Sequence, residues 1–454
     1  MKHLRKPLCL LAALAMAVSL LAGPALAEAT NPQNIHEPVD MGGQTITLSY
    51  NWDIIPPNTD YVLPDDATFE QKHWMENLKR IEEKYNVKIQ YINTPYDQIA
   101  ERLTTSVLAG DPFCDLLNLG GDMLIPAVRN GEILALEPIA PKNADIFNAR
   151  VASYPSFLFN GAHYTIRDNN VPIGAAYIVY NRDITDKLGL GDPQELAADG
   201  QWTWDKFMEI AKAATQDTNG DGVADQWGWG GTPGRHLPQW VASNDGQMYD
   251  AETMTWGMTD AKALEALEFL DRIYSVEKVA YVHNDDVNDY GGNDSAFREG
   301  NVAMSYAELW MMPTGEPRLP YRQGAVSFPK GPANTSGKLW TSSDVGGIVV
   351  VNGTPNPTWA VTIIEELNAW WGDDFGRKSD GTYMWIESMW STEEDVDYLV
   401  DLSTDGGVIN LWGLIPGLPT GDMLNDVLVN SMTPAQAVET HRQVAQDAIN
   451  QALK

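Results

Sequence analysis

Two hydrophobic periods alternate in the N-terminal part of the chain. Apolar and polar residues alternate with a period of two over residues 45–50, which predicts a β-strand. Apolar side chains then recur at the three- or four-residue spacing of one helical face, at Trp74, Leu78, Ile81 and Tyr85. The same order follows again, with a strand over residues 87–92, a helix that ends near Gly110 and a buried strand over residues 115–119. This order predicts a parallel sheet with crossover helices.

The rest of the chain mixes strands and helices without a repeat. Short apolar runs predict strands over residues 177–180, 303–306 and 347–351. A helix is predicted over residues 204–214, with Thr203 as its N-cap. Further helices are predicted around residues 263–274, 363–371 and 434–453. Because no clear linker separates these units, we expect an α/β protein with two lobes that exchange chain segments.

The N-terminus has the pattern of a secretory signal peptide. Basic residues precede an apolar run over residues 8–21, and small residues follow at Ala25 and Ala27. We therefore expect cleavage after Ala27 and export to the periplasm or to the outer face of the cell membrane. The only cysteine of this segment, Cys9, stands at the start of the apolar run and not at the cleavage site, so no lipobox is present.

The charge balance restricts the class of partner. Lys and Arg total 30 against 62 Asp and Glu, a formal net charge of -32. Nucleic acid and anionic membranes are disfavoured, because a polyanion is bound through Lys and Arg. Zinc-hydrolase and nucleophile-elbow motifs are absent, and the glycine-rich segment at residues 331–338 has the wrong spacing for a phosphate loop. A carboxylate pair for glycoside hydrolysis stays possible.

One local motif matches the first nine positions of a calcium-binding loop. Hard oxygen ligands fall at positions one, three, five, seven and nine, and position twelve is a glycine where a glutamate is usual. The candidate ligands are Asp217, Asn219, Asp221, the carbonyl of Val223 and Asp225. A metal-free turn has the same composition, so both interpretations stay open. A filled site would be structural.

Tryptophan is the second chemical signal, with 16 residues in the chain. Several stand beside glycine, proline or polar residues and outside helical stripes. These are Trp52, Trp229, Trp240, Trp310, Trp340 and Trp412. A flat aromatic face stacks on the apolar face of a sugar ring while neighbouring polar groups bind its hydroxyls. For each of these residues the alternative is packing in the core.

Several segments occur in an order that resembles a known family. They include residues 102–117, Trp202-Thr-Trp-Asp-Lys-Phe207, and Phe297-Arg-Glu-Gly300 followed by Ala303-Met304. This order resembles the extracellular, or periplasmic, solute-binding proteins of ABC sugar importers, family 1, the group that includes maltose-binding protein. The resemblance implies the α/β periplasmic-binding-protein fold, with two lobes, an interlobe hinge and chain crossovers between the lobes.

The resemblance also implies the boundaries of the lobes. The implied segments are a signal peptide over 1–27, the first part of lobe 1 over 28–172, the first part of lobe 2 over 173–343, a return to lobe 1 over 344–375, and a crossover with the C-terminal helices of lobe 2 over 376–454.

Carried over residue by residue, the resemblance implies ligand contacts in both lobes. Trp310 matches the family's stacking aromatic, and Glu308 would face the same cleft. Gly121 and Asp122 match the loop after the third strand. The other implied contacts are Arg235, His236 and Trp240 in the second lobe, Ser343 and Asp344 at the second crossover, and Trp412 near the C-terminus. The aromatic argument adds Trp52.

The function implied by the resemblance is solute capture without catalysis. The ligand would be a carbohydrate, with a neutral oligosaccharide preferred, and a monomeric protein would deliver it to ABC permease subunits. Calcium (Ca2+) would be a structural ion. Two alternatives stay open at this point. One is a receptor of the same fold for a polyamine or another cation, and the other is a secreted glycoside-active enzyme.

Overall fold

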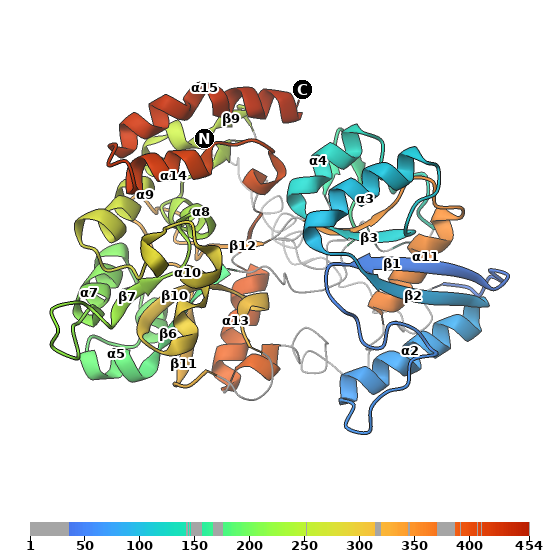
Figure 1. Cartoon of the computed structure of the whole chain (residues 1–454), viewed down its shortest axis with the longest axis horizontal. Coiled ribbons are helices and arrows are strands. Elements are labelled where there is room, and N and C mark those ends of the chain that lie inside the picture. The colour runs from blue at the N-terminus through green and yellow to red at the C-terminus, as the bar shows by residue number, and fades with distance from the viewer. Residues whose placement is uncertain are drawn as a thin grey trace, which may run out of the picture.

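The chain folds around two four-stranded sheets, one in each of two lobes (Figure 1). The structure is a computed structural model. It describes residues 36–141, 144, 146, 157–166, 176–250, 252–313, 319–343, 346–369, 386–390, 392–405, 407–409 and 411–453. The predicted signal peptide lies outside these ranges. Within them, no helix combines the length and the apolar character needed to cross a membrane.

The N-terminal lobe contains the predicted parallel sheet. Its strand order is β13 (Gly347–Val350), β3 (Leu116–Leu119), β1 (Gln44–Tyr50) and β2 (Val87–Asn93). Strand β1 runs parallel to both β2 and β3, whereas β13 returns from the second lobe and pairs antiparallel with β3. The helices of this lobe are α2 (Phe69–Tyr85), α3 (Tyr96–Leu108), α4 (Gly121–Arg129) and α11 (Pro357–Asn368).

The C-terminal lobe is built on a mixed sheet. Its order is β11 (Gln323–Val326), β6 (Ala176–Asn181), β10 (Val302–Glu308) and β7 (Trp227–Gly230). Strand β10 is antiparallel to β6 and parallel to β7. The helices of this lobe are α5 (Arg182–Leu188), α6 (Pro193–Ala198), α7 (Trp204–Ala214), α8 (Pro233–Ser243), α9 (Ala261–Asp271), α10 (Tyr290–Ser295), α13 (Glu393–Asp405), α14 (Thr420–Leu428) and α15 (Pro434–Leu453).

Short elements complete the structure. The strands are β4 (Leu158–Phe159), β5 (Ala162–His163), β8 (Tyr249–Asp250), β9 (Thr255–Trp256), β12 (Thr341–Ser343) and β14 (Gly407–Ile409). The short helices are the 3-10 helices η2 (Gly257–Thr259), η4 (His283–Asp285), η5 (Ala296–Glu299), η6 (Leu309–Met311) and η9 (Leu411–Leu414) and the π-helix η3 (Arg272–Val276). Strands β12 and β14 pair with each other in parallel.

Local sequence explains where the helices begin and end. Thr68 and Gln71 form a reciprocal capping box at the start of α2, and Asn86 ends that helix in a left-handed conformation. Thr203 caps α7 through a hydrogen bond from the backbone of Lys206, as its sequence position predicts. These caps satisfy backbone groups that would otherwise lack partners.

Several tryptophans of the C-terminal lobe form its core. Trp202, Trp229 and Trp256 are almost completely buried. Trp204 stacks on Phe269 with ring centroids 4.4 Å apart and an angle of 12° between the rings. Burial of such large aromatic side chains supplies much of the apolar area that stabilises a core. For these residues, core packing is the correct interpretation of the tryptophan signal.

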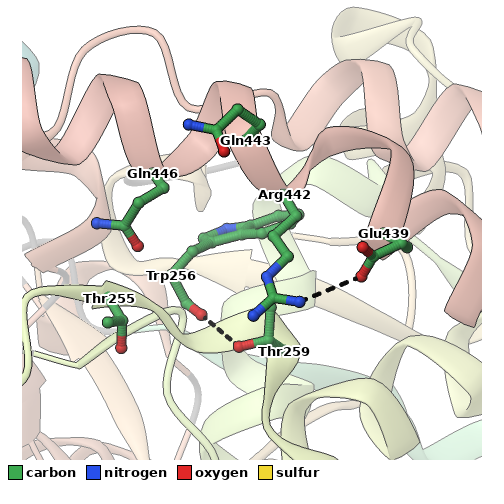
Figure 2. Close-up of a pocket in the computed structure, with 7 residues that line it drawn as sticks. All are labelled: Thr255, Trp256, Thr259, Glu439, Arg442, Gln443 and Gln446. Atoms are coloured by element: carbon green, nitrogen blue, oxygen red, sulfur yellow. Dashed lines mark hydrogen bonds and ion pairs between the residues drawn. The ribbon is translucent and has the colours of Figure 1, made fainter.

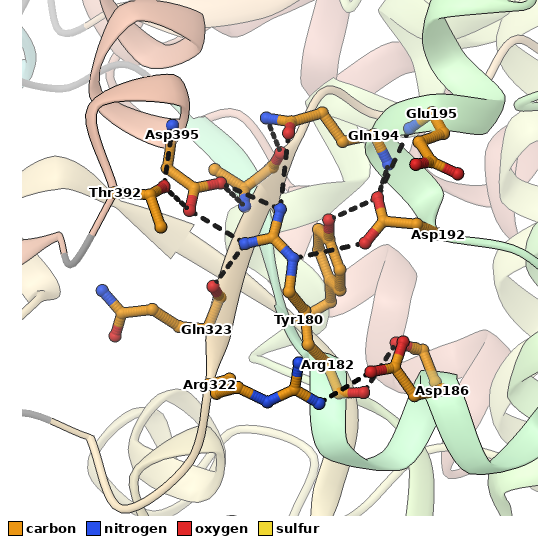
Figure 3. Close-up of polar contacts among 12 residues, drawn as sticks. Tyr180, Arg182, Asp186, Asp192, Gln194, Glu195, Arg322, Gln323, Thr392 and Asp395 are labelled. Atoms are coloured by element: carbon orange, nitrogen blue, oxygen red, sulfur yellow. Dashed lines mark hydrogen bonds and ion pairs between the residues drawn. The ribbon is translucent and has the colours of Figure 1, made fainter.

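A buried ion-pair network attaches α13 to the sheet of the C-terminal lobe (Figure 3). The guanidinium of Arg182 pairs with Asp395 at 2.9 Å and with Asp192 at 3.2 Å. Asp192 also accepts a hydrogen bond of 2.7 Å from the hydroxyl of Tyr180. Asp395 is buried, so its charge depends on Arg182 and on the hydroxyl of Thr392 for compensation.

We predict that Asp395→Ala destabilises the protein by roughly 3–5 kcal/mol, because the guanidinium of Arg182, only 18% exposed, would lose one of its two carboxylate partners. Chemical denaturation measures this change. Asp186→Ala is the matched control, because Asp186 pairs with Arg322 in an exposed position and its loss costs at most about 1 kcal/mol. If both variants lost the same free energy of unfolding, the buried network would not stabilise the fold more than an exposed ion pair does.

A second buried charge joins α11 to α2 in the N-terminal lobe. Glu366 is 0% exposed and accepts hydrogen bonds from Lys84 at 2.7 Å, Tyr85 at 2.6 Å and Arg80 at 3.0 Å. Burial raises the pKa of Glu366, but the hydrogen bonds and charges of these partners outweigh burial and lower the pKa below its usual value.

This lowered pKa predicts a pH-dependent stability. The ionised side chain of Glu366 stabilises the folded state. This stabilisation is fully present above the unfolded-state pKa of about 4.3 and is lost as the pH falls toward the lower folded-state pKa. Denaturation curves recorded between neutral and acidic pH measure this change in the free energy of unfolding. Glu366→Gln should reduce the loss of stability on acidification relative to the native chain. An unchanged pH profile in that variant would show that other carboxyl groups control acid unfolding.

Candidate functional site

The candidate site of the C-terminal lobe is assembled at the ends of β7 and β10. The chain leaves β7 through Gly231, whose φ of +118° is unfavourable for other residues and where an added Cβ atom would come within 2.8 Å of the Cβ atom of Tyr306. Helix α8 begins directly afterwards and places Arg235 in its first turn. Glu308 is the last residue of β10, and Trp310 follows in η6. Segments far apart in sequence thus converge on one point.

Arg235 is the centre of this group. Its guanidinium pairs with Asp294 of α10 at 2.7 Å and lies 3.6 Å from the carboxylate of Glu308. The same guanidinium lies over the ring of Tyr290, 5.2 Å from its centroid, and over the ring of Trp310 at 5.4 Å. These cation–π contacts and ion pairs hold the two aromatic rings in place.

Trp310 is oriented and exposed at the same time. Its indole nitrogen donates a 2.6 Å hydrogen bond to Glu308, which also accepts a hydrogen bond from the hydroxyl of Tyr306. Despite these restraints, 51% of the Trp310 surface is exposed. A large aromatic ring that is fixed but open to solvent can bind a ligand without losing much rotational freedom.

The charge of this group is not fully balanced. One guanidinium faces the two carboxyl groups of Asp294 and Glu308. Burial raises the pKa of Asp294, and the hydrogen bonds and charge from Thr232 and Arg235 only partly offset that effect. The group therefore has no excess positive charge to bind an anionic ligand.

The N-terminal lobe carries a second group at the carboxyl ends of its parallel strands. Trp52 follows β1, Tyr96 follows β2, and Gly121 and Asp122 follow β3. Carboxyl ends of parallel strands meet at one edge of a sheet, which is the usual ligand side of such folds. The hydroxyl of Tyr96 donates a 2.5 Å hydrogen bond to Asp122. Trp52, 43% exposed, packs edge-on against Tyr50.

Two predicted ligand contacts are buried in the core of the C-terminal lobe. His236 and Trp240 are completely buried, and their side chains are hydrogen-bonded to each other at 3.1 Å. His236 also contacts Trp229 and Tyr274, and burial lowers its pKa to about 3, which keeps the ring neutral. Both residues lie on the inner face of α8, whereas Arg235 lies on its outer side. They support the site from within the core.

Three other predicted contacts stay predictions. Ser343 ends β12, but its side chain lies outside the described residues, as does Asp344. Trp412 lies in η9, and its side chain is also outside the described part.

Three residues of the two groups were missed by sequence reasoning. Tyr96, Tyr290 and Asp294 belong to the contacts described above. Tyr96 could have been found, because it comes four residues after the end of the predicted strand over residues 87–92 and at the start of a helix. Tyr290 and Asp294 lie in the short helix α10, whose glycine-rich sequence has no helical apolar pattern.

The predicted calcium loop forms a compact series of turns. Asp217 accepts hydrogen bonds from the backbone nitrogens of Gly220 and Gly222 at 2.6 and 2.7 Å. Hydrogen bonds from Thr218 and Asn219 to Asp225 lower the pKa of that carboxyl group. Within the described residues, no three His, Cys, Asp or Glu side chains converge as a metal site. The oxygen donors suit a hard cation, but several of them bind backbone groups here.

Comparison with known proteins places the chain in a family. A model of the bacterial extracellular solute-binding protein family matches residues 69–367, about two thirds of the sequence. No curated protein sequence matches the chain.

Solved structures share the fold at low sequence identity. An ABC substrate-binding protein from Listeria monocytogenes in complex with cycloalternan is 18% identical, has a TM-score of 0.64, and the match covers 90% of this chain and 98% of that one. The maltose/maltodextrin-binding domain from Bdellovibrio bacteriovorus bound to maltotriose is 14% identical, with a TM-score of 0.63 and coverage of 89% and 100%.

A cyclic alpha-maltosyl-1,6-maltose binding protein from Arthrobacter globiformis is also 14% identical, with a TM-score of 0.63 and coverage of 90% and 100%. These matches confirm the two-lobed periplasmic-binding-protein fold, and the family match extends across both lobes. The chain therefore belongs to the bacterial extracellular solute-binding proteins.

Proposed function

We propose that the protein is the extracytoplasmic substrate-binding component of an ABC importer and that it captures a neutral carbohydrate between its lobes. The observation that carries this proposal is Trp310, an exposed ring that Glu308 and Arg235 hold in place. The N-terminal lobe adds two exposed aromatic rings, Trp52 and Tyr96, at the carboxyl edge of its sheet.

The chemistry of both groups suits a sugar. The aromatic rings offer flat apolar surfaces, while the carboxylates of Glu308 and Asp122 and the guanidinium of Arg235 can bind hydroxyl groups. Relatives of the same fold were solved with cycloalternan, maltotriose and alpha-D-tagatose, which supports the same ligand class here.

A cationic ligand fits the C-terminal group less well. In a polyamine receptor, aromatic rings and carboxylates would surround the ligand's ammonium groups. Here, the guanidinium of Arg235 already occupies the position between Tyr290, Trp310 and the two carboxylates. A neutral ligand avoids repulsion from both the cation and the carboxylates.

The proposed mechanism is conformational and involves no chemical step. The ligand binds the open lobes, the lobes close by hinge motion, and the closed form docks on membrane permease subunits. A ligand shifts this equilibrium only as far as it binds the closed form more tightly, so contacts from both lobes must contribute.

Trp310→Ala is expected to reduce the affinity for the sugar by about 2–4 kcal/mol, because the stacking surface is removed. Isothermal titration calorimetry measures this loss. Phe69→Ala is the control, because Phe69 is an equally exposed aromatic residue at the start of α2, outside both groups. If the two variants retained the same affinity, Trp310 would not be a ligand contact.

The ligand class can be found with a thermal-shift screen of the chain from Glu28. The panel contains maltotriose, tagatose, ribitol, glucuronate and spermidine, and each sugar is analysed afterwards for breakdown products. A raised melting temperature with an intact neutral sugar supports the proposal. A shift with spermidine alone contradicts the ligand class, and sugar breakdown contradicts a purely binding function.

The loop at residues 217–225 is proposed as a structural calcium site. Its support is the spacing of oxygen donors and the sharp turns at Gly220 and Gly222, with φ of 83° and 91°. Side chains that now bind backbone groups would turn toward the ion. No step of sugar binding depends on this site.

We predict that added calcium raises the melting temperature and that a chelator reverses the effect, while sugar affinity is unchanged. Differential scanning calorimetry with and without chelator is the measurement. In Asp221→Ala the response to calcium should disappear. A native chain that does not respond to calcium would show that the loop is a metal-free turn.

A further inference from the structure

A pocket lies on the C-terminal lobe, between α15 and the segment formed by β9 and η2 (Figure 2). Its volume is about 540 Å³, within the range of roughly 300–1,000 Å³ that is typical of small-molecule sites. One wall consists of four polar side chains of α15, and the other contains Thr259 and the indole of Trp256. None of these residues belongs to the group around Arg235, so the pocket is a separate site.

The floor of this pocket holds a hydrogen-bond donor without a partner. Trp256 is 1% exposed, and within the described residues its indole nitrogen has no acceptor. In Figure 2 the indole lies beneath Arg442 and Gln443. A buried donor that lacks an acceptor costs about 1–3 kcal/mol, so natural proteins rarely keep one without a reason. The nitrogen is itself buried, so an incoming acceptor would recover that energy only after the side chains of Arg442 and Gln443 that lie above the indole move aside.

The walls of the pocket present mainly acceptor atoms. Gln446 uses its amide hydrogens on the carbonyl of Met254 at 2.9 Å and on Asn450 at 3.4 Å, which leaves its oxygen free. Thr259 donates its hydroxyl hydrogen to the carbonyl of Trp256 at 3.0 Å, so its lone pairs can accept. A ligand that binds these walls must bring hydrogen-bond donors.

Arg442 supplies the donors of the pocket. Its only recorded partner in the described part of the chain is Glu439, at 3.5 Å. The pair is exposed, so it is weak and leaves most of the guanidinium hydrogens available. Because the charges of Arg442 and Glu439 cancel, the pocket as a whole favours a ligand without net charge.

We propose that this pocket is an accessory site for a neutral polyhydroxylated molecule, a sugar or a polyol. A hydroxyl group both donates and accepts, so a chain of hydroxyls can bind Gln446 and Thr259 through its hydrogens and Arg442 and Trp256 through its oxygens. The inference is independent of the proposed transport function, because it uses none of the residues at the ends of β7 and β10.

The experiment follows the indole N–H signals of the 15N-labelled chain by NMR, with ribitol, glucose and maltotriose as probes at millimolar concentrations. The signal that is missing in Trp256→Phe identifies Trp256. We expect this signal to shift saturably with at least one probe. The shift should persist in Trp310→Ala, and the affinity should fall at least tenfold in Arg442→Ala and in Gln446→Ala.

Val444→Ala is the matched control, because Val444 is exposed on the same helix but does not line the pocket. It should bind the probe like the native chain. Three results would overturn the proposal. They are the absence of a saturable shift with all three probes, a shift that Trp310→Ala abolishes, and a shift that Arg442→Ala and Gln446→Ala leave unchanged. If no sugar bound between the lobes but the Trp256 signal still shifted, only the proposed transport function would be contradicted.

Discussion

Strand β10 determines the geometry of the C-terminal lobe and of its candidate site. It pairs antiparallel with β6, where Glu308 is opposite Ala176, and parallel with β7, where Ser305 is opposite Gly230. This register sets the end of β10 beside the start of α8, and it thereby brings Glu308 and Trp310 to Arg235. A shift of one residue would turn these side chains to the other face of the sheet.

Buried charges connect distant segments in both lobes, whereas the candidate site presents exposed aromatic rings. Glu366 joins α11 to α2, and Asp395 joins α13 to the sheet through Arg182. Each charge connects segments that are distant in sequence, so each helps to define how the returning chain packs. The rings of Trp310 and Tyr96, in contrast, are oriented by hydrogen bonds to Glu308 and Asp122 and remain accessible.

Much of the fold was predictable from the sequence because its elements have clear periods. The strands and helices from β1 to β3 follow the predicted order, and α7 begins at its predicted cap. The antiparallel pairing of β13 with β3 was not predictable, because strand direction depends on a chain return from the other lobe. The exact lobe boundaries stay a prediction.

The candidate site was less predictable, because hydrophobic patterns do not distinguish a buried tryptophan from an exposed one. Trp240 lies between Gln239 and Val241 and Trp310 lies between Leu309 and Met311, yet Trp240 is in the core and Trp310 is on the surface. His236 and Arg235 are adjacent in sequence but lie on opposite sides of α8. Which side faces a ligand depends on packing between distant segments, and no local pattern encodes it.

The central claim is that a sugar binds by closing the two lobes. Spin labels at Leu108→Cys in the N-terminal lobe and Val276→Cys in the C-terminal lobe would report it, because both sites are highly exposed whereas Cys114 is buried. Pulsed electron paramagnetic resonance measures the distance distribution between the labels. The account predicts a new, narrower distribution when the sugar binds, and no such change in Trp310→Ala. An unchanged distribution in the sugar-saturated protein would contradict it.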